Sequence, residues 1–199
     1  MSPCLALNLR EMNSLKDLLP IKTSRLLLRM LEQDEAHLIT AYVNENREHL
    51  QHLEPSRSEG YYKPDFWESE IKRIQNDFFL GQALRLCIFF RKSPKGPIIG
   101  VCNFTNILRG VLQACFLGYS VDHKYQGQGI MYEALNASID FVFKHLKLHR
   151  IMANYMPRNE KSGKLLKKLG FVFEGYAGDY LKINGQWEDH ILTSKISPY

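Results

Sequence analysis

A glycine-rich turn between an apolar run and a long periodic segment places the strongest constraint on how this 199-residue chain folds. Residues 116–121 are largely apolar, residues 126–129 read Gln-Gly-Gln-Gly, and a segment with helical periodicity then continues to about Leu146. Glycines in such a turn let several backbone N–H groups, and the positive end of the helix dipole, face one point. This geometry suits an anion, and a pyrophosphate in particular, although a strand-to-helix turn without a ligand explains the same residues.

Two common phosphate-binding loops do not match this turn. A dinucleotide-binding fingerprint requires a third glycine three residues after Gly129, where the chain has Tyr132, and it follows the first strand rather than a late one. A nucleoside-triphosphate loop ends in Gly-Lys-Ser or Gly-Lys-Thr, and the turn has no such ending. The turn is therefore a candidate phosphate loop of another class.

Composition restricts the class of protein more than its function. Hydrophobic residues make up 45% of the chain and charged residues 24%, which is typical of a globular domain with its own core. The net charge of +5 fits a phosphorylated co-substrate or work near nucleic acid, but no RNA-binding signature occurs and we expect no direct DNA binding. Without a secretory signal or an apolar run of about 18 residues, the expected location is cytoplasmic and not membrane-bound.

The metal-ligating residue types do not form a convincing metal site. No pair of the four cysteines has the spacing of a metal or redox motif, and the last three lie in apolar, strand-like runs that predict core positions. His49 and His52 have a spacing that metals use, but no third ligand stands out, and solvated loop histidines explain them better. We therefore expect no metal. The four cysteines are Cys4, Cys87, Cys102 and Cys115.

Hydrophobic periodicity predicts one α/β domain in the order β-α-α-β-β-β-α-β-α-β-β. Asp34 and Asp65 are the predicted N-caps of the two early helices, and Asn159 is that of the last helix. Asn184-Gly185 predicts a two-residue hairpin turn near the end of the chain. The expected strand segments are residues 23–30, 84–91, 97–106, 113–121, 150–155, 171–174, 180–183 and 187–195.

Three motifs, in the right order, resemble the Gcn5-related N-acetyltransferase (GNAT) superfamily. Residues 124–129 are similar to its acetyl-CoA loop, with Lys124 in place of the usual arginine or glutamine. Residues 159–175 resemble its Asn-x-x-Ser…Lys-x-Gly-Phe…Glu-Gly ending, and residues 23–29 resemble its first strand. The resemblance covers about residues 21–196 and implies one domain, residues 21–199, after a leader of residues 1–20. It also implies a central mixed, mostly antiparallel sheet of about seven strands, about four flanking helices, and a splay between the fourth and fifth strands.

Within the superfamily the chain resembles the RimJ branch, which acetylates protein N-termini. Residues 165–171, 174–177, 179–181 and 185–190 carry this resemblance. It implies a cytoplasmic enzyme that transfers acetyl directly from acetyl-CoA to the N-terminal alanine of a small-subunit ribosomal protein. The expected partner is the N-terminal segment of that ribosomal protein. Association with the ribosome or pre-ribosome is compatible with this function. The chain is expected to be a monomer or a dimer.

The resemblance also implies which residues bind acetyl-CoA. Backbone groups of the fourth strand would pair with the pantetheine arm and polarise the thioester carbonyl. Backbone N–H groups of the turn would hold the pyrophosphate, the positive charge of Lys124 would support them, and Asn159 would contact the pantetheine arm. The strand residues are Tyr119, Ser120 and Val121, and the turn residues are Gln126, Gly127, Gln128, Gly129, Ile130 and Met131.

The catalytic residues are less well defined. Many relatives place a tyrosine, as the acid for the leaving thiolate, at the position where this chain has Leu166. Ser162 matches a serine to which the RimJ and RimL branches assign that role, and a surface serine on a helix is the other explanation. For the general base, Asp179 and Glu54 are both candidates, although a solvated carboxylate explains each of them better.

Three functions stay open at the level of sequence. The first is the N-terminal acetyltransferase, and the second keeps the fold but acetylates a polyamine, an antibiotic or a lysine side chain. A peptide acceptor predicts an open groove between the early helices and the last hairpin, whereas a small amine predicts a closed, acidic pocket. The third is a ribosome- or RNA-associated binding protein that keeps the fold without the activity.

Overall fold

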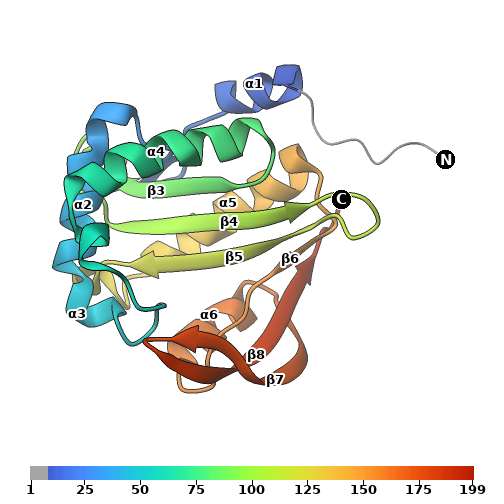
Figure 1. Ribbon diagram of the computed structural model, residues 1–199. Helices are drawn as coiled ribbons and strands as arrows, with labels where there is room; N and C mark the ends of the chain where they lie inside the picture. Colours follow the sequence, from blue (N-terminus) through green and yellow to red (C-terminus); the bar gives the residue numbers. More distant parts are fainter. Residues whose placement is uncertain (1–8) are drawn as a thin grey trace.

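The computed structural model describes residues 9–199, which form one α/β domain around an eight-stranded sheet (Figure 1). The strand order is β1-β2-β3-β4-β5-β6-β8-β7, and every neighbouring pair is antiparallel except the parallel pair β5–β6. The strands are β1 (Ile21–Lys22), β2 (Leu26–Arg29), β3 (Leu84–Phe90), β4 (Gly100–Leu108), β5 (Ala114–Val121), β6 (Arg150–Met152), β7 (Val172–Ile183) and β8 (Gln186–Ile196). The α-helices are α1 (Leu9–Asp17), α2 (Ala36–Glu45), α3 (Arg47–Leu50), α4 (Pro64–Phe79), α5 (Ile130–Leu146) and α6 (Glu160–Lys168). Three 3-10 helices are η1 (Gln33–Glu35), η2 (Glu59–Tyr62) and η3 (His123–Tyr125).

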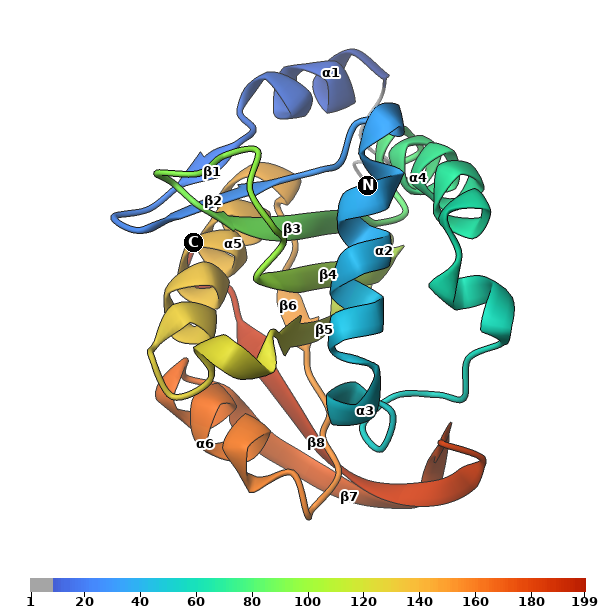
Figure 2. The ribbon, with the colours of Figure 1, turned by 90° about the vertical axis from the view of Figure 1, so that its left-hand side faces the viewer.

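The central strands are buried on both faces because helices cover each side (Figure 2). Successive side chains of a strand point to opposite faces, so Leu86 and Ile88 of β3 pack into the cluster that includes α5. Cys87 and Phe89, one position on, pack into the cluster that includes α2 and α4. Two hydrophobic cores on either side of one sheet explain why these strands read as continuous apolar runs.

The predicted splay is present between β5 and β6, which are the fourth and fifth strands of the sequence prediction. Their parallel pairing covers only three residue pairs, from Ala114↔Arg150 to Phe116↔Met152. Beyond Phe116, β5 continues along β4, whereas the chain after β6 follows β8, with Ala153 N–H donating to Thr193 O at 2.9 Å. Figure 1 shows the two strands diverging from this point. The backbone of β5 from residue 117 onward is thus left without a partner strand on that side.

The fold class is confirmed, and three details differ from the prediction. The sheet has eight strands, because a short β1 pairs with β2, and six α-helices flank it in the described part of the chain. Residues 171–174 and 180–183 belong to one strand, β7, whose pairing with β8 shifts register twice. Gly175, Gly178 and Asp179, which has a positive φ, lie at these shifts. Residues of these types are typical of turns, so the sequence does not show that the strand is continuous.

Both predicted aspartate N-caps are wrong. A 3-10 turn precedes α2, and the carboxylate of Glu35, not Asp34, accepts the Glu32 N–H at 2.9 Å while it also pairs with Arg29. Helix α4 has Lys63 at its N-cap and begins at Pro64, which fits the first position because proline has no N–H to leave unpaired. Asp65 lies in the first turn of α4, where its charge complements the helix dipole.

Part of the predicted leader packs against the domain. Met12 and Leu15 of α1 are buried in the same cluster as α5 and the central strands. Residues 1–8, with Cys4, lie outside the described residues, and the domain boundary after residue 20 stays a prediction. Among the described helices, none is long and apolar enough to cross a membrane.

Candidate active site

The splay between β5 and β6 opens into a cavity of about 1630 Å³. Its lining includes the glycine-rich turn, the start of α5 and Asn184 of the β7–β8 hairpin. It also includes residues of α2, α3, α4 and α6 and of the loop between α3 and α4. The volume exceeds the roughly 300–1,000 Å³ that is usual for one drug-sized ligand, so two substrates fit together.

The glycine-rich turn has the conformation that the phosphate-loop hypothesis requires. Gly127 and Gly129 have φ of +73° and +72°, in the left-handed region that disfavours residues with a Cβ. Gly129 is the N-cap of α5, and the first bond back along the helix runs from Glu133 N–H to Gly129 O at 3.1 Å. The N–H groups before Glu133 therefore lack intrahelical acceptors. A Cβ at Gly127 would meet no atom within 4 Å, which leaves the turn open to a ligand.

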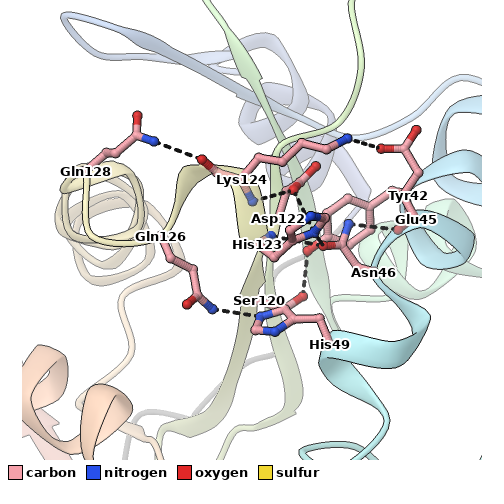
Figure 3. Close-up of polar contacts among 10 residues, drawn as sticks. All are labelled: Tyr42, Glu45, Asn46, His49, Ser120, Asp122, His123, Lys124, Gln126 and Gln128. Carbon is pink, nitrogen blue, oxygen red and sulfur yellow. Dashed lines mark hydrogen bonds and ion pairs between the residues drawn. The ribbon is translucent and has the colours of Figure 1, made fainter.

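Side chains at the end of α2 and in the segment that leads into the turn hold its backbone in place (Figure 3). The buried Asn46 side chain accepts the His123 N–H at 3.0 Å, and Asp122 accepts the Lys124 N–H at 2.9 Å. The Lys124 ammonium pairs with Glu45 at 2.9 Å. These contacts fix the backbone of η3 immediately before the first glycine, so the turn is held in place without a ligand.

Gln126 connects α3 with α6 across the cavity. Its amide nitrogen lies 2.7 Å from His49 Nε2 of α3 (Figure 3). Its amide oxygen accepts a hydrogen bond from Lys161 of α6 at 3.0 Å. Burial lowers the pKa of His49, and the neighbouring His123 and His52 lower it further. His49 is therefore neutral near pH 7, and its Nε2 accepts the Gln126 amide hydrogen.

A pair of hydroxyl groups spans the splay. Tyr119 Oη of β5 and Ser162 Oγ of α6 are 2.6 Å apart, and both residues line the cavity. Burial raises the pKa of Tyr119 to about 12, so the phenol keeps its proton at neutral pH. The pair therefore holds a hydrogen that can be directed toward the cavity.

Helix α6 is positioned by its first residues. The Asn159 side chain accepts the Ser162 N–H at 3.2 Å, which confirms the predicted N-cap. A Cβ at Gly163 would lie 2.7 Å from the Tyr155 ring, so only glycine allows the helix to approach the chain that follows β6 this closely. Residue 162 is thereby brought within reach of β5.

Glu54 is a partly buried carboxylate that lines the cavity. Its side chain is 29% exposed, and Arg57 lies 3.6 Å away. Burial raises the pKa of Glu54, and Arg57 offsets only part of that shift. The Glu54 carbonyl accepts the Asn184 N–H at 3.0 Å, which ties this loop to the last hairpin.

Comparisons with known proteins agree with this geometry. Residues 25–172 match the model of the acetyltransferase (GNAT) domain. The chain is 44% identical over 178 residues to the ribosomal protein uS5-alanine N-acetyltransferase of Escherichia coli (strain K12), covering 89% of this chain and 91% of that protein. The chain belongs to the GNAT acetyltransferase family. It is also similar to the crystal structure of a ribosomal-protein-S5-alanine acetyltransferase from Vibrio fischeri, with 42% identity, a TM-score of 0.86, and coverage of 90% and 97%. RimJ of Mycobacterium smegmatis, in complex with CoA-disulfide, has 27% identity, a TM-score of 0.80, and coverage of 86% and 82%.

As a GNAT acetyltransferase, the chain uses acetyl-CoA as its acetyl donor. The residues present fit this co-substrate. The open turn at Gly127 offers backbone N–H groups to a pyrophosphate, and Lys161, Lys164 and Lys168 of α6 line the same cavity, with Lys161 in contact with Gln126 of the turn. The unpaired edge of β5 beyond Phe116 offers backbone groups to an extended arm. Among the described residues, no group of histidine, cysteine and carboxylate side chains has the arrangement of a metal site.

The structure brings most of the predicted site residues to one cavity, and leaves three outside it. Lys124 is held by Glu45, and the Gln128 side chain turns back to the Lys124 carbonyl at 2.9 Å. Asp179 is exposed on β7, where its N–H donates to Asp189 Oδ1 at 2.8 Å. The roles predicted for the site residues stay predictions. Those that line the cavity are Glu54, Tyr119, Ser120, Val121, Gln126, Gly127, Gly129, Ile130, Met131, Asn159 and Ser162.

Several side chains of the cavity were not predicted. Tyr119 was predicted for its backbone only, and His49 was interpreted as a solvated loop residue. The Tyr42 hydroxyl of α2 lies 2.9 Å from the Ser120 hydroxyl, and Arg85 of β3 also lines the cavity. Strand alternation alone places Tyr119 on the face opposite to Ser120. Tyr42, His49 and Arg85 lie 36 residues or more before the turn in the chain, so no local sequence pattern connects them with it.

Proposed function

We propose that this chain is an acetyl-CoA-dependent N-terminal acetyltransferase whose acceptor is the N-terminal alanine of a small-subunit ribosomal protein. The observation that carries the proposal is the cavity, which continues past the phosphate turn and between the early helices to the last hairpin. This is the open groove expected for a peptide acceptor. The similarity to the uS5-alanine N-acetyltransferase supports the choice of alanine and of a ribosomal protein.

The charge of the cavity disfavours a small cationic acceptor. Its lining has seven lysine and arginine side chains against three glutamates. A polyamine would meet a net repulsion there, whereas a peptide brings one α-amino group and carries acceptor groups along its backbone. The proposal also places the chain in the cytoplasm, in contact with a ribosomal protein before or after that protein joins the ribosome.

In this proposal Glu54 is the general base. Acetyl-CoA supplies the reactive thioester when it is bound. The acceptor amine must lose a proton to attack, and a carboxylate with a raised pKa takes that proton more readily than an exposed glutamate does. Asp179, the other predicted candidate, does not line the cavity and is exposed on β7.

The Tyr119–Ser162 pair is the proposed proton source for the leaving thiolate. If the Tyr119 hydroxyl donates to Ser162 Oγ, the Ser162 hydrogen is available to the cavity. Burial keeps Tyr119 protonated, so the donor persists across the working pH range. The Asn159 cap holds the backbone of Ser162 in place during the reaction.

Ser162→Ala will lower kcat about 10-fold and leave the affinity for acetyl-CoA unchanged. The loss is modest because a thiol pKa of about 8.5 makes the thiolate a fair leaving group. Tyr119→Phe will give a smaller loss, since Ser162 keeps its own hydroxyl. Thiol release at saturating acetyl-CoA measures both effects. An unchanged kcat in Ser162→Ala would remove the assignment.

The proposed function is tested by incubating the chain with acetyl-CoA and peptides that differ in their first residue. We expect thiol release and a mass increase at the α-amino group of peptides that begin with alanine. The same peptides with a blocked N-terminus serve as controls and will not react. Acetylation of lysine side chains or polyamines, without any product from the alanine peptides, would contradict the proposal.

A further inference from the structure

Arg85 is a half-buried cation of the cavity without a partner in the described part of the chain. Its Nε is buried and has no hydrogen-bond acceptor there, and no carboxylate lies within 4.0 Å of its guanidinium. The neighbouring arginines do have partners. Arg57 pairs with Glu54 at 3.6 Å, and Arg73 pairs with both Glu70 and Asp77. The nearest acidic groups are therefore already engaged by other cations.

A buried charge without a partner is unfavourable, so its presence in the cavity calls for a ligand. Burial lowers the pKa of Arg85, and the charge of Arg73 lowers it further. A guanidinium nevertheless stays protonated in proteins, so the cation persists. Its planar fork of N–H donors matches a carboxylate, which accepts two parallel hydrogen bonds. The chemistry thus fits an anionic ligand group better than a neutral one.

Arg85 lies two strands away from β5, across the sheet. Arg85, Asn103 and Gly118 are paired neighbours on β3, β4 and β5, which lie side by side (Figure 1), and all three line the cavity. A Cβ at Gly118 would meet no atom within 4 Å, so the space above β5 is open. Neighbouring strands are about 4.8 Å apart, which puts Arg85 about 10 Å from Gly118 across the sheet.

We propose that Arg85 selects acceptor peptides with an acidic side chain at the third or fourth residue, by binding its carboxylate. The inference rests on the proposed function: if the thioester carbonyl lies against the backbone of β5, the amine that attacks it lies over that strand as well. An extended peptide advances about 3.4 Å per residue, so three residues span the distance from β5 to Arg85. Asn103, which lies between them, can hydrogen-bond the peptide backbone on the way.

The test compares peptides that begin with alanine and carry either Glu or Gln at one position from the second to the fifth. For the wild-type chain we expect a KM about 10-fold lower with Glu than with Gln at position three or four, and equal kcat values. Arg85→Gln will remove this preference, and it will not lower the melting temperature because it removes an unpaired cation. Arg85→Lys keeps the charge without the fork and will retain part of the preference.

Arg91→Gln is the matched control, because Arg91 directly follows β3 and donates to Thr23 O outside the cavity. This variant will keep the full preference. Equal KM values for Glu and Gln peptides at every position would overturn the inference, as would a preference that survives in Arg85→Gln. If Arg85→Gln does not fold, an undiminished preference in Arg85→Lys overturns it instead. Failure to acetylate any peptide, while small amines react, would overturn the proposed function itself.

Discussion

Gly127→Asp will abolish the rise in melting temperature that acetyl-CoA gives the wild-type chain. Two effects act together at this residue. A side chain at φ +73° is strained by about 1–2 kcal/mol, and the new carboxylate repels the pyrophosphate from the N-terminus of α5. The loss of two charge-assisted hydrogen bonds would lower the affinity for acetyl-CoA by at least about 100-fold. Thermal unfolding with and without acetyl-CoA measures the effect.

Gly110→Asp separates these two effects. Gly110 has a φ of +74°, and a Cβ there would also meet no atom within 4 Å, but the residue lies in the turn between β4 and β5, outside the cavity. This variant will lose a similar amount of stability and keep the full response to acetyl-CoA. If the wild-type chain does not respond to acetyl-CoA and Gly127→Asp changes nothing, the chain would be a binding protein that keeps only the fold.

Glu54→Gln will lower kcat/KM for the acceptor peptide by about 100-fold, because a glutamine cannot take the proton of the amine. The wild-type rate will also depend on pH. The base works only when it is ionised, so kcat/KM falls as the pH drops through the raised pKa of Glu54, above the usual 4.5 for a glutamate. Glu54→Gln will lack this limb of the profile. Initial rates of thiol release across the pH range measure both effects.

Glu59→Gln is the control for Glu54→Gln. Glu59 is exposed in η2, in the same loop, where it pairs with Arg47. Its replacement will leave the rate and the pH profile unchanged. A wild-type profile in Glu54→Gln would exclude Glu54 as the base, and the proton would then have to pass to water or to another group of the cavity.

The co-substrate half of the site was predictable because its information is local. The two glycines, the following helix and the Asn159 cap lie in two short segments, and backbone geometry follows from such residues directly. Errors in the fold had local causes as well. Asp34 and Asp65 are favourable N-cap residues, but a 3-10 turn precedes α2 and Pro64 begins α4. The sequence predicts two strands in place of β7 because the residues at its bulges are typical of turns.

The residues proposed to act on the acceptor and on the leaving group could be identified only from the tertiary structure. Glu54 and Asp179 are equivalent carboxylates in the sequence, and only the packing of the 51–62 loop against the last hairpin puts Glu54 in the cavity and leaves Asp179 at the surface. Likewise, Tyr119 meets Ser162 because β5 and β6 diverge and Gly163 lets α6 approach.

The sequence by itself therefore determined the family, the fold class and the phosphate turn, since each depends on residues that are neighbours along the chain or on regular periodicity. The burial of Glu54, the hydroxyl pair and the unpaired Arg85 were decided only by the tertiary structure. The physical reason is that burial and ionic partnership depend on contacts between distant segments. Folding buries the Glu54 carboxylate and leaves the Arg85 guanidinium without a counter-ion in the described part of the chain, and neither property can be read from the sequence around these residues.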